Sequence, residues 1–332
     1  MTDDRHGEMM TVLRRTSIGA LAAALVALAL PATAAGDGSV SPIAAIDMPT
    51  LATSGTDGTV EQVRQIVQCG PRMYAVGRFT RVKQAGITYR RRNAFSFDAT
   101  TGEVSSWNPD VNGRVNSIAL SADCSTAYLG GTFTSINGSS ARNIAAVGTG
   151  TPGTVRHAFA HSASAKVNTV VLAGPHLLVG GTFTSINGSR RNYMVSLDPT
   201  TGEDDGYVAL NISGNYEYTN RDGRSSTYNA TQVYNVSMSP SGGKLLVMGV
   251  FTSAGGRARR QIFMLNLGAT TTVDAWYSRE FNRNCSIVEP FWLQDASWSP
   301  DMSTVYIATT GYKPANGPGS YRTDPRAGLC DV

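Results

Sequence analysis

The chain has 332 residues, 41% of them hydrophobic and 16% charged, with 35 glycines and a formal net charge of +4. This length is sufficient for a sizeable core, and few charges with abundant glycine are typical of an all-β protein with many tight turns. The charge excess is small, and the arginines recur at equivalent places in a repeat rather than in one run. We therefore expect no nucleic-acid partner.

The first 35 residues have the layout of a secretory signal peptide. Arg14 and Arg15 precede an apolar stretch over residues 18–30, and small residues ending in Ala34 and Ala35 follow it. The apolar stretch is too short to span a bilayer. We predict a signal peptide over residues 1–35 that is cleaved after Ala34 or Ala35, and a secreted domain over residues 36–332 with no membrane span. Both the general and the twin-arginine export routes stay open.

The main feature of the remaining sequence is a repeated phrase. The residues from Gly130 to Ser139 return almost letter for letter from Gly180 to Ser189, and looser copies occupy residues 76–80 and 248–252. Their phenylalanines are 54, 50 and 68 residues apart, which is about the length of one propeller blade. We expect these four aromatic side chains to pack between neighbouring repeats: Phe79, Phe133, Phe183 and Phe251.

Each repeat has the same order of predicted elements. A first strand, as at residues 115–120 and 167–172, is followed by a hairpin turn and a second strand, as at residues 244–248. The Gly-Gly-x-Phe phrase, a polar loop and a third strand come next, and an Asp-x-Thr-Thr-Gly turn leads to a fourth strand. Third strands are predicted over residues 144–147, 193–197 and 262–265, and fourth strands carry Trp107, Phe159 or Trp276. Four short strands per repeat indicate antiparallel blades.

The phrases GGTFTSINGSSARNIAAV and GGTFTSINGSRRNYMVSLDPTTGE resemble those of the bacterial Delta-60 type repeat proteins, a family of exported β-propellers. The resemblance covers about residues 60–312. It implies an all-β propeller of four-stranded antiparallel blades, here with four clear blades and a partial fifth. It implies no particular chemistry, because the family has no settled activity and propellers serve as enzymes, binders and scaffolds alike.

The fifth repeat begins at Leu293 and contains two recognisable strands before the sequence ends. Residues 43–51 are candidates for one outer strand by ring closure, but they do not supply both of the strands that this repeat lacks. We therefore expect a C-terminally incomplete propeller, with a closed five-bladed ring and a degenerate last blade as the alternative. An incomplete propeller would expose an unpaired strand edge.

All four cysteines follow the predicted signal peptide, and none belongs to a CxxC pair. An even number of cysteines in an exported protein favours two disulfides over a metal site. Cys69 and Cys124 occupy equivalent turns in consecutive repeats, and Cys285 and Cys330 lie in loops peculiar to the last repeat. We predict these two pairings, although four cysteines allow three connectivities.

The most irregular segment, residues 204–232, lengthens one repeat and contains several tyrosines among Asn, Ser and Gly. Long insertions on a rigid scaffold often carry binding sites, and tyrosine with Asn and Asp suits sugars, since flat rings stack on them and polar groups reach their hydroxyls. Our candidate ligand-binding residues are Tyr216, Tyr218 and Tyr228 in this insertion and Trp292 in a second one, residues 283–293. The alternative is a loop that packs its own tyrosines.

No residue set in the sequence has a catalytic, cofactor-binding or metal-binding pattern. His157 and His161 are four residues apart, but strand-and-loop structure does not bring such a pair together as a helix would. We expect the acidic run from Glu203 to Asp205 to form a solvated turn. The remaining acid-base candidates show no spacing that singles out a pair: Asp204, Asp205, Glu280, Glu289 and Asp295.

Three functions agree with these observations. The first is a secreted binding or scaffolding module for an extracellular carbohydrate or another extracellular protein. The second is a structural surface module, or a fragment without activity of its own. The third is a polysaccharide hydrolase or lyase, which needs clustered acid and base groups. We favour the first, and we expect no cofactor, no metal and no enzymatic activity.

Overall fold

The computed structural model describes residues 47–52, 60–219, 225–228, 230–279, 281 and 292–310. These residues form strands and turns, with no α-helix among them, as the all-β prediction requires. They belong to one compact unit, residues 46–332. No helix in this described part of the chain is long and apolar enough to cross a membrane. The predicted signal peptide, residues 1–35, lies outside the described residues.

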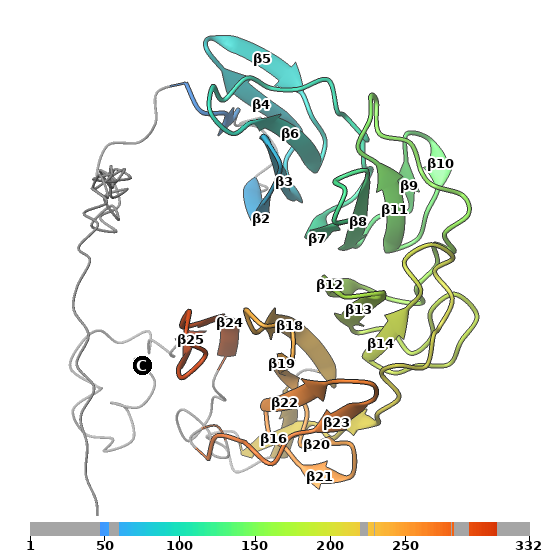
Figure 1. Cartoon of the computed structure of the whole chain (residues 1–332), viewed down its shortest axis with the longest axis vertical. Helices are drawn as coiled ribbons and strands as arrows, with labels where there is room; N and C mark the ends of the chain where they lie inside the picture. Colours follow the sequence, from blue (N-terminus) through green and yellow to red (C-terminus); the bar gives the residue numbers. More distant parts are fainter. Residues whose placement is uncertain are drawn as a thin grey trace, which may run out of the picture. The chain divides into compact units, whose positions relative to one another are not determined.

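Five antiparallel sheets follow one another along the described chain, and we number them 1 to 5 (Figure 1). Sheet 1 contains β2 (Gln62–Cys69), β3 (Arg72–Arg78) and β6 (Ala94–Asp98); sheet 2 contains β7 (Val115–Leu120), β8 (Thr126–Gly131) and β11 (Ile144–Gly148); sheet 3 contains β12 (Val167–Ala173), β13 (His176–Gly181) and β14 (Met194–Leu197). Sheet 4 contains β18 (Gln232–Met238), β19 (Lys244–Val250), β22 (Ile262–Leu267) and β23 (Thr271–Val273), and sheet 5 contains β24 (Trp292–Trp298) and β25 (Val305–Thr310). The predicted first, second and third strands are thereby confirmed.

The polar loops between second and third strands contain small hairpins that the sequence did not predict. One of these hairpins pairs with a strand from the start of the domain, and another pairs with a strand from the long insertion. The insertion also forms a separate hairpin that precedes sheet 4. These strands are β1 (Thr50–Leu51), β4 (Arg81–Gln84), β5 (Ile87–Arg90), β9 (Ser135–Ile136), β10 (Ser139–Ser140), β15 (Ile212–Ser213), β16 (Tyr216–Thr219), β17 (Ser225–Tyr228), β20 (Ser253–Ala254) and β21 (Arg257–Ala258).

The predicted fourth strand is wrong for most repeats. Only sheet 4 has one in the described residues, β23, and it ends before Trp276, which is 38% exposed. In sheets 1 to 3 the returning chain makes a single bridge instead, for example Phe97 to Val104. The aromatic side chains that suggested strands have another role: Trp107 and Phe159 are fully buried, and Trp107 Nε1 donates to the carbonyl oxygen of Gly148 at 2.9 Å.

Residues 50–51 do not extend the fifth sheet, so the candidate outer strand over residues 43–51 is wrong for these two residues, and residues 43–46 lie outside the described residues. Thr50 pairs with Lys83 and Leu51 with Val82, so β1 joins the β4–β5 hairpin of the first repeat. Leu51 packs against the buried cluster that contains Phe79 and Val82, which gives this apolar residue a covered position next to its own repeat. This burial favours the local pairing.

The four repeated phenylalanines are buried, as expected, with at most 1% of each residue exposed. Phe133, Phe183 and Phe251 lie in clusters that combine side chains of neighbouring sheets. The expected packing between repeats is wrong for Phe79, whose cluster contains only side chains of the first repeat and of residues 48 and 51. Phe133 of the second repeat shares its cluster with Tyr74 and Val76 on β3, and Phe183 of the third shares its cluster with Tyr128 on β8. The sheets are therefore held together by an apolar layer between each pair of neighbours, as a repeat architecture requires.

The two glycines of the Gly-Gly-x-Phe phrase are needed for two different close contacts. A Cβ on Gly130 would lie 2.5 Å from Cγ1 of Val167 on the next sheet, and one on Gly180 would lie 2.6 Å from Cγ1 of Val233. A Cβ on the second glycine, Gly131, would overlap the backbone carbonyl oxygen of Arg114 in its own sheet. The first glycine therefore permits sheets to approach, and the second permits strands within a sheet to do so.

We expect Gly131→Ala to lower the free energy of unfolding by about 1–3 kcal/mol, because the added methyl meets backbone that has little freedom to move. Gly148→Ala is the matched control, since a Cβ there would lie 3.8 Å from its nearest neighbour, and its effect should stay within about 0.5 kcal/mol. Urea-induced unfolding of both variants measures the difference. Equal effects would show that the close contact at Gly131 is not required.

Candidate functional site

A cavity of about 670 Å³ lies among the first strands of the five sheets. These strands contact one another in chain order, β2 with β7, β7 with β12, β12 with β18 and β18 with β24 (Figure 1). Every one of them contributes side chains to the cavity wall. The polar uncharged ones are Gln65, Asn116, Ser117, Asn168, Thr169, Tyr234, Asn235 and Gln294.

A β-bulge at the same position of each first strand determines which side chains line the cavity. The pairing register shifts between residues 63 and 65, 115 and 117, 167 and 169, 233 and 235, and 293 and 295. A bulge places two residues of one strand opposite one residue of its partner. Accordingly, at least two consecutive residues of each strand line the cavity, as Asn116 and Ser117 do on β7.

Side-chain amides fix this wall by connecting neighbouring first strands. Asn116 Nδ2 donates to the carbonyl oxygen of Val167 at 2.8 Å, and Asn168 Nδ2 donates to that of Val233 at 2.7 Å. Asn235 Nδ2 donates to Oδ1 of Asp295 at 2.9 Å. Each of these bonds joins one sheet to the next, so the polar wall is held in place before any ligand binds.

The cavity wall is positively charged on the side formed by β2, β7 and β12. Arg64, Arg114 and Lys166 all line it, and none of their side chains makes an ion pair or hydrogen bond to another described residue. Burial lowers the pKa of Arg114 and of Lys166, and the neighbouring cations, Arg64 among them, lower both further. Among the described residues that line the cavity, Asp295 on β24 is the one carboxylate.

This arrangement is suited to binding rather than to bond cleavage. Fixed amides and hydroxyls offer hydrogen bonds to a polar ligand, and cations on one side attract negative charge. The sequence reasoning did not identify Arg64, Arg114 or Lys166. The available signal was the Val-Asn-Ser and Val-Asn-Thr phrases at residues 115–117 and 167–169, each with a basic residue before it.

The candidate ligand-binding tyrosines lie on one hairpin next to sheet 4. Tyr216 pairs with Tyr228 and Tyr218 with Ser226 across β16 and β17. The base of the hairpin is closed by Thr231, whose backbone N–H and hydroxyl both donate to Oδ1 of Asn215. The next residue begins β18, which lines the cavity. Binding by these tyrosines stays a prediction.

Trp292, the fourth candidate, is the first residue of β24 and pairs with Thr310. It directly precedes Leu293, which lines the cavity. Most of the second insertion, including Glu289, lies outside the described residues, as does Glu280. Binding by Trp292 is likewise still a prediction.

The expected solvated turn at residues 203–205 is wrong for the two aspartate side chains. Asp204 forms an ion pair with Arg191 at 2.6 Å, and its side chain is 9% exposed. Asp205 accepts hydrogen bonds from His176 Nδ1 at 2.6 Å and from the Ser196 hydroxyl at 2.5 Å. Both carboxylates therefore have a structural role, because they connect the turn to strands β13 and β14 and to Arg191 in the loop between these strands.

His157 and His161 lie closer together than their spacing predicted. Their ring centroids are 5.9 Å apart, with the rings nearly perpendicular. The chain turns sharply between them, because the backbone N–H of Phe159 donates to the carbonyl oxygen of Arg156 at 3.0 Å. Within the described residues, no group of three or more His, Cys, Asp or Glu is placed to hold a metal ion.

Asp205→Asn should make the fold less sensitive to acid. Burial raises the pKa of the Asp205 carboxyl, but hydrogen bonds from His176, Ser196 and the backbone of Tyr207 outweigh it and leave the pKa below its usual value. The carboxylate therefore stabilises the fold above the unfolded-state pKa of about 3.9, and this contribution is lost as the pH falls through the lower folded-state pKa.

At neutral pH we expect Asp205→Asn to cost on the order of 1 kcal/mol of unfolding free energy, and at about pH 3 the difference from the wild type should shrink. Urea titrations at both pH values measure this. Glu203→Gln is the control, because Glu203 is exposed and makes no side-chain hydrogen bond to a described residue. A constant difference at both pH values would contradict the assignment.

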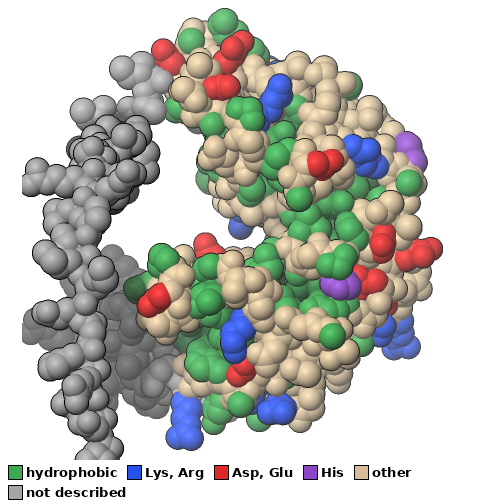
Figure 2. Space-filling model, in the orientation of Figure 1, with side chains coloured by type: hydrophobic (Ala, Val, Ile, Leu, Met, Phe, Trp, Pro, Cys, Tyr) green, Lys and Arg blue, Asp and Glu red, His purple; other side chains and the backbone are tan. Residues whose placement is uncertain are grey.

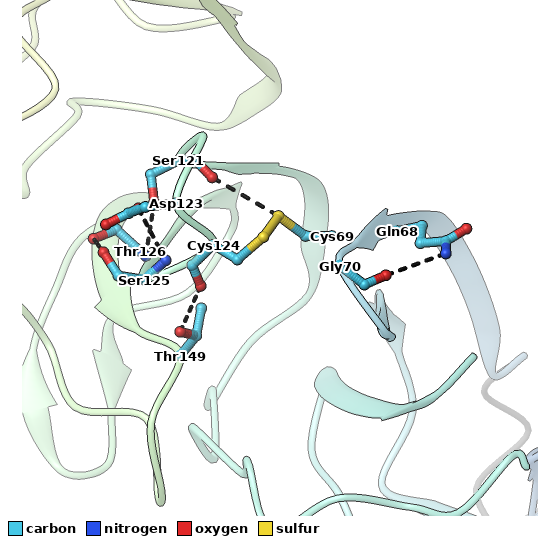
Figure 3. Close-up of a disulfide and its surroundings, with 9 residues drawn as sticks. All are labelled: Gln68, Cys69, Gly70, Ser121, Asp123, Cys124, Ser125, Thr126 and Thr149. Atoms are coloured by element: carbon cyan, nitrogen blue, oxygen red, sulfur yellow. Dashed lines mark hydrogen bonds between the residues drawn. A yellow bond between two sulfur atoms is a disulfide. The ribbon is translucent and has the colours of Figure 1, made fainter. Parts of the chain in front are cut away.

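The predicted disulfide between Cys69 and Cys124 is confirmed, with a Cα–Cα distance of 5.8 Å. Figure 3 shows it joining the end of β2 to the turn between β7 and β8. Asp123 shapes that turn by accepting hydrogen bonds from Ser121 and Ser125, which lower the pKa of its carboxyl to about 2. Cys285 and Cys330 lie outside the described residues, so their pairing stays a prediction.

Comparison with known protein families finds a match over a short part of the chain. Residues 176–200 match the family model of a domain of unknown function (DUF5122), described as a beta-propeller. No curated protein shows significant similarity to the chain. The matched residues include β13, the Gly-Gly-x-Phe phrase and β14 of sheet 3. Over this stretch, the all-β chain is therefore similar to a β-propeller family whose function is unknown.

Proposed function

We propose that this protein is a secreted binding module whose site is the cavity among the first strands and whose ligand is an extracellular carbohydrate. The observation that supports it is the polar wall formed by consecutive bulge residues of all five sheets. Amides and hydroxyls are the groups that recognise sugar hydroxyls, because they both donate and accept hydrogen bonds. The wall is rigid, since its asparagines already bridge neighbouring strands.

Aromatic rings add the second element of sugar recognition. Tyr234 lines the cavity on β18, and the β16–β17 hairpin with Tyr216, Tyr218 and Tyr228 leads directly into that strand. We assign these tyrosines, with Trp292 at the start of β24, to contacts with parts of a long carbohydrate that extend beyond the cavity. Sugar rings stack on such flat apolar faces.

The lining residues favour binding over hydrolysis. Glycoside hydrolysis generally requires two carboxyl groups on either side of the scissile bond. Among the described lining residues, Asp295 alone is acidic, and its Oδ1 accepts hydrogen bonds from Asn235 and from the backbone N–H of Ala296. This use of Asp295 positions a strand and leaves no acid-base pair in the described wall.

A carbohydrate array probed with the full-length protein tests the proposal. We expect binding of at least one carbohydrate without release of shorter products. Gln294→Ala should weaken that binding about 3- to 10-fold through the loss of a cavity hydrogen bond, because Gln294 lines the cavity and is exposed. Gln68→Ala, on β2 but outside the cavity wall, is the matched control.

Two results would contradict the proposal. Absence of binding to every carbohydrate would favour a structural module or a protein partner. Release of shortened products would show a hydrolase or lyase, and the acid-base groups would then have to be sought among residues such as Glu280 and Glu289.

A further inference from the structure

The three cations that line the cavity come from three neighbouring repeats, and each lies near the start of the first strand of its sheet. Arg114 and Lys166 each precede the valine that comes just before the bulge, Val115 or Val167, in sheets 2 and 3. Arg64 is the bulge residue itself in sheet 1. The bulge of β2 places Arg64 in the cavity wall, and Arg114 and Lys166 line the cavity from the residues just before β7 and β12, so the three charges come from three neighbouring sheets.

Elsewhere in the described chain, several cations that hold parts of the fold together have an acidic or a carbonyl partner, as when Arg91 and Arg259 donate to backbone carbonyl oxygens. Lys244 lies 2.6 Å from Asp274, and Arg191 lies 2.6 Å from Asp204. The three cavity cations have no such partner among the described residues, and Nε of Arg114 is buried without a hydrogen bond. A buried donor without a partner costs free energy, so its retention needs another explanation than stability.

The lowered pKa values of Arg114 and Lys166 agree with a ligand-binding role for these cations. Burial is the main cause that lowers the pKa of Arg114 and of Lys166, and Arg64 lowers both as well. Each protonated cation therefore destabilises the others. Groups that are held together against such repulsion are typical of sites where a ligand of opposite charge binds.

We propose that the carbohydrate bound in the cavity is acidic, and that Arg64, Arg114 and Lys166 together bind a carboxylate or sulfate group on it. This inference rests on the proposed function and specifies its ligand. A guanidinium group binds an oxyanion through two parallel hydrogen bonds, and a lysine adds a point charge. The opposite side of the cavity, with Asp295 and Gln294 on β24, faces the uncharged hydroxyls of the same ligand.

The distribution of charge over the rest of the surface separates this ligand from a nucleic acid. Figure 2 shows lysines and arginines scattered over one face and interspersed with acidic side chains. Binding of a nucleic-acid backbone requires a continuous basic strip that contacts successive phosphates. The cavity offers instead a local cluster of three cations inside a polar wall, which suits a single acidic group on a sugar.

Isothermal titration calorimetry of the full-length protein tests the inference with three oligosaccharides of equal length: neutral, uronate-containing and sulfated. We expect the neutral one to bind at least about 10-fold more weakly than one of the acidic ones. Added salt should weaken the acidic ligand selectively. The uronate and sulfated samples distinguish a carboxylate from a sulfate as the bound group, and a single-stranded oligonucleotide is included as a further sample.

Variants locate the effect in the cavity. Arg114→Gln and Lys166→Gln should each weaken binding of the acidic oligosaccharide about 10- to 100-fold, which is the loss of one charge-assisted hydrogen bond. Arg257→Gln and Lys83→Gln remove exposed cations outside the cavity and should leave binding unchanged. Without ligand, Arg114→Gln should melt at the same or a higher temperature than the wild type, because it removes a repelled charge.

The binding and melting measurements distinguish failure of this inference from failure of the proposed function. Equal affinity for neutral and acidic oligosaccharides would overturn the inference and leave the proposed function intact. Absence of binding to all three, or binding of the oligonucleotide alone, would overturn the proposed function itself. A lower melting temperature of Arg114→Gln together with lost binding would make Arg114 a structural residue and would also overturn the inference.

Discussion

Phe133→Ala is expected to lower the free energy of unfolding by about 3–5 kcal/mol. Phe133 is 1% exposed and lies in the cluster between sheets 1 and 2, where Trp107, Val111 and Ile136 are also buried. Loss of the ring removes its transfer free energy and leaves a cavity that two rigid sheets do not readily fill. Such a cost is a large fraction of the total stability of an ordinary domain.

Urea-induced unfolding, followed by circular dichroism, measures this effect. Phe133→Leu should cost much less than Phe133→Ala, since it retains most of the buried volume. Tyr306→Ala is the control for an aromatic residue outside the core, because Tyr306 is 64% exposed, and it should change the free energy of unfolding by no more than about 0.5 kcal/mol. A small effect of Phe133→Ala would mean that the layer between sheets 1 and 2 contributes little to stability.

The same contacts explain why much of the fold was predictable from the sequence. Gly130 and Gly131 permit approaches that any other residue would block, and Phe133 fills the space between sheets. The second glycine and the phenylalanine recur in the first four repeats, and the first glycine recurs in the second and third, so the phrase can be recognised in the sequence without a structure. The turn at Asp98 is equally predictable from the sequence, because an Asp side chain favours such a turn by accepting backbone hydrogen bonds. Asp98 Oδ1 accepts hydrogen bonds from the N–H groups of Thr100 and Thr101.

The candidate site was not predictable in this way. Strand alternation assigns Asn116 and Ser117 to opposite faces, but the bulge in β7 lets both line the cavity. A bulge changes pairing by a single residue, and nothing in a single sequence marks it as a turn is marked by Asp, Pro or Gly. The clustering of Arg64, Arg114 and Lys166 also depends on contacts between sheets that are about 50 residues apart in the chain.

The wrong predictions of the fourth strand and of the outer strand over residues 43–51 also arise because tertiary contacts place these segments. Trp107 and Phe159 were interpreted as strand residues because aromatic residues favour strands, yet burial alone accounts for their positions. Leu51 contacts the first repeat rather than the fifth because a covered position is available nearby. Propensity indicates what a residue prefers locally, whereas these segments are placed by tertiary contacts.

Removal of the Cys69–Cys124 disulfide should lower the free energy of unfolding by about 4 kcal/mol. The two cysteines are separated by 55 residues, and the entropy lost by the unfolded chain when a loop of this length is closed corresponds to this value at room temperature. The bond also connects the first hairpins of sheets 1 and 2, which belong to different sheets (Figure 3). Its loss therefore removes a covalent restraint between two repeats.

The double variant Cys69→Ser/Cys124→Ser, compared with the wild type by urea-induced unfolding, measures this contribution. Both proteins are measured with and without a reducing agent, because reduction also opens any bond between Cys285 and Cys330. The difference should be present under oxidising conditions and vanish under reducing ones, where neither protein has the Cys69–Cys124 bond. A difference that persists under reducing conditions would mean that the serine side chains, rather than the missing bond, destabilise the turn at Ser121 and Asp123.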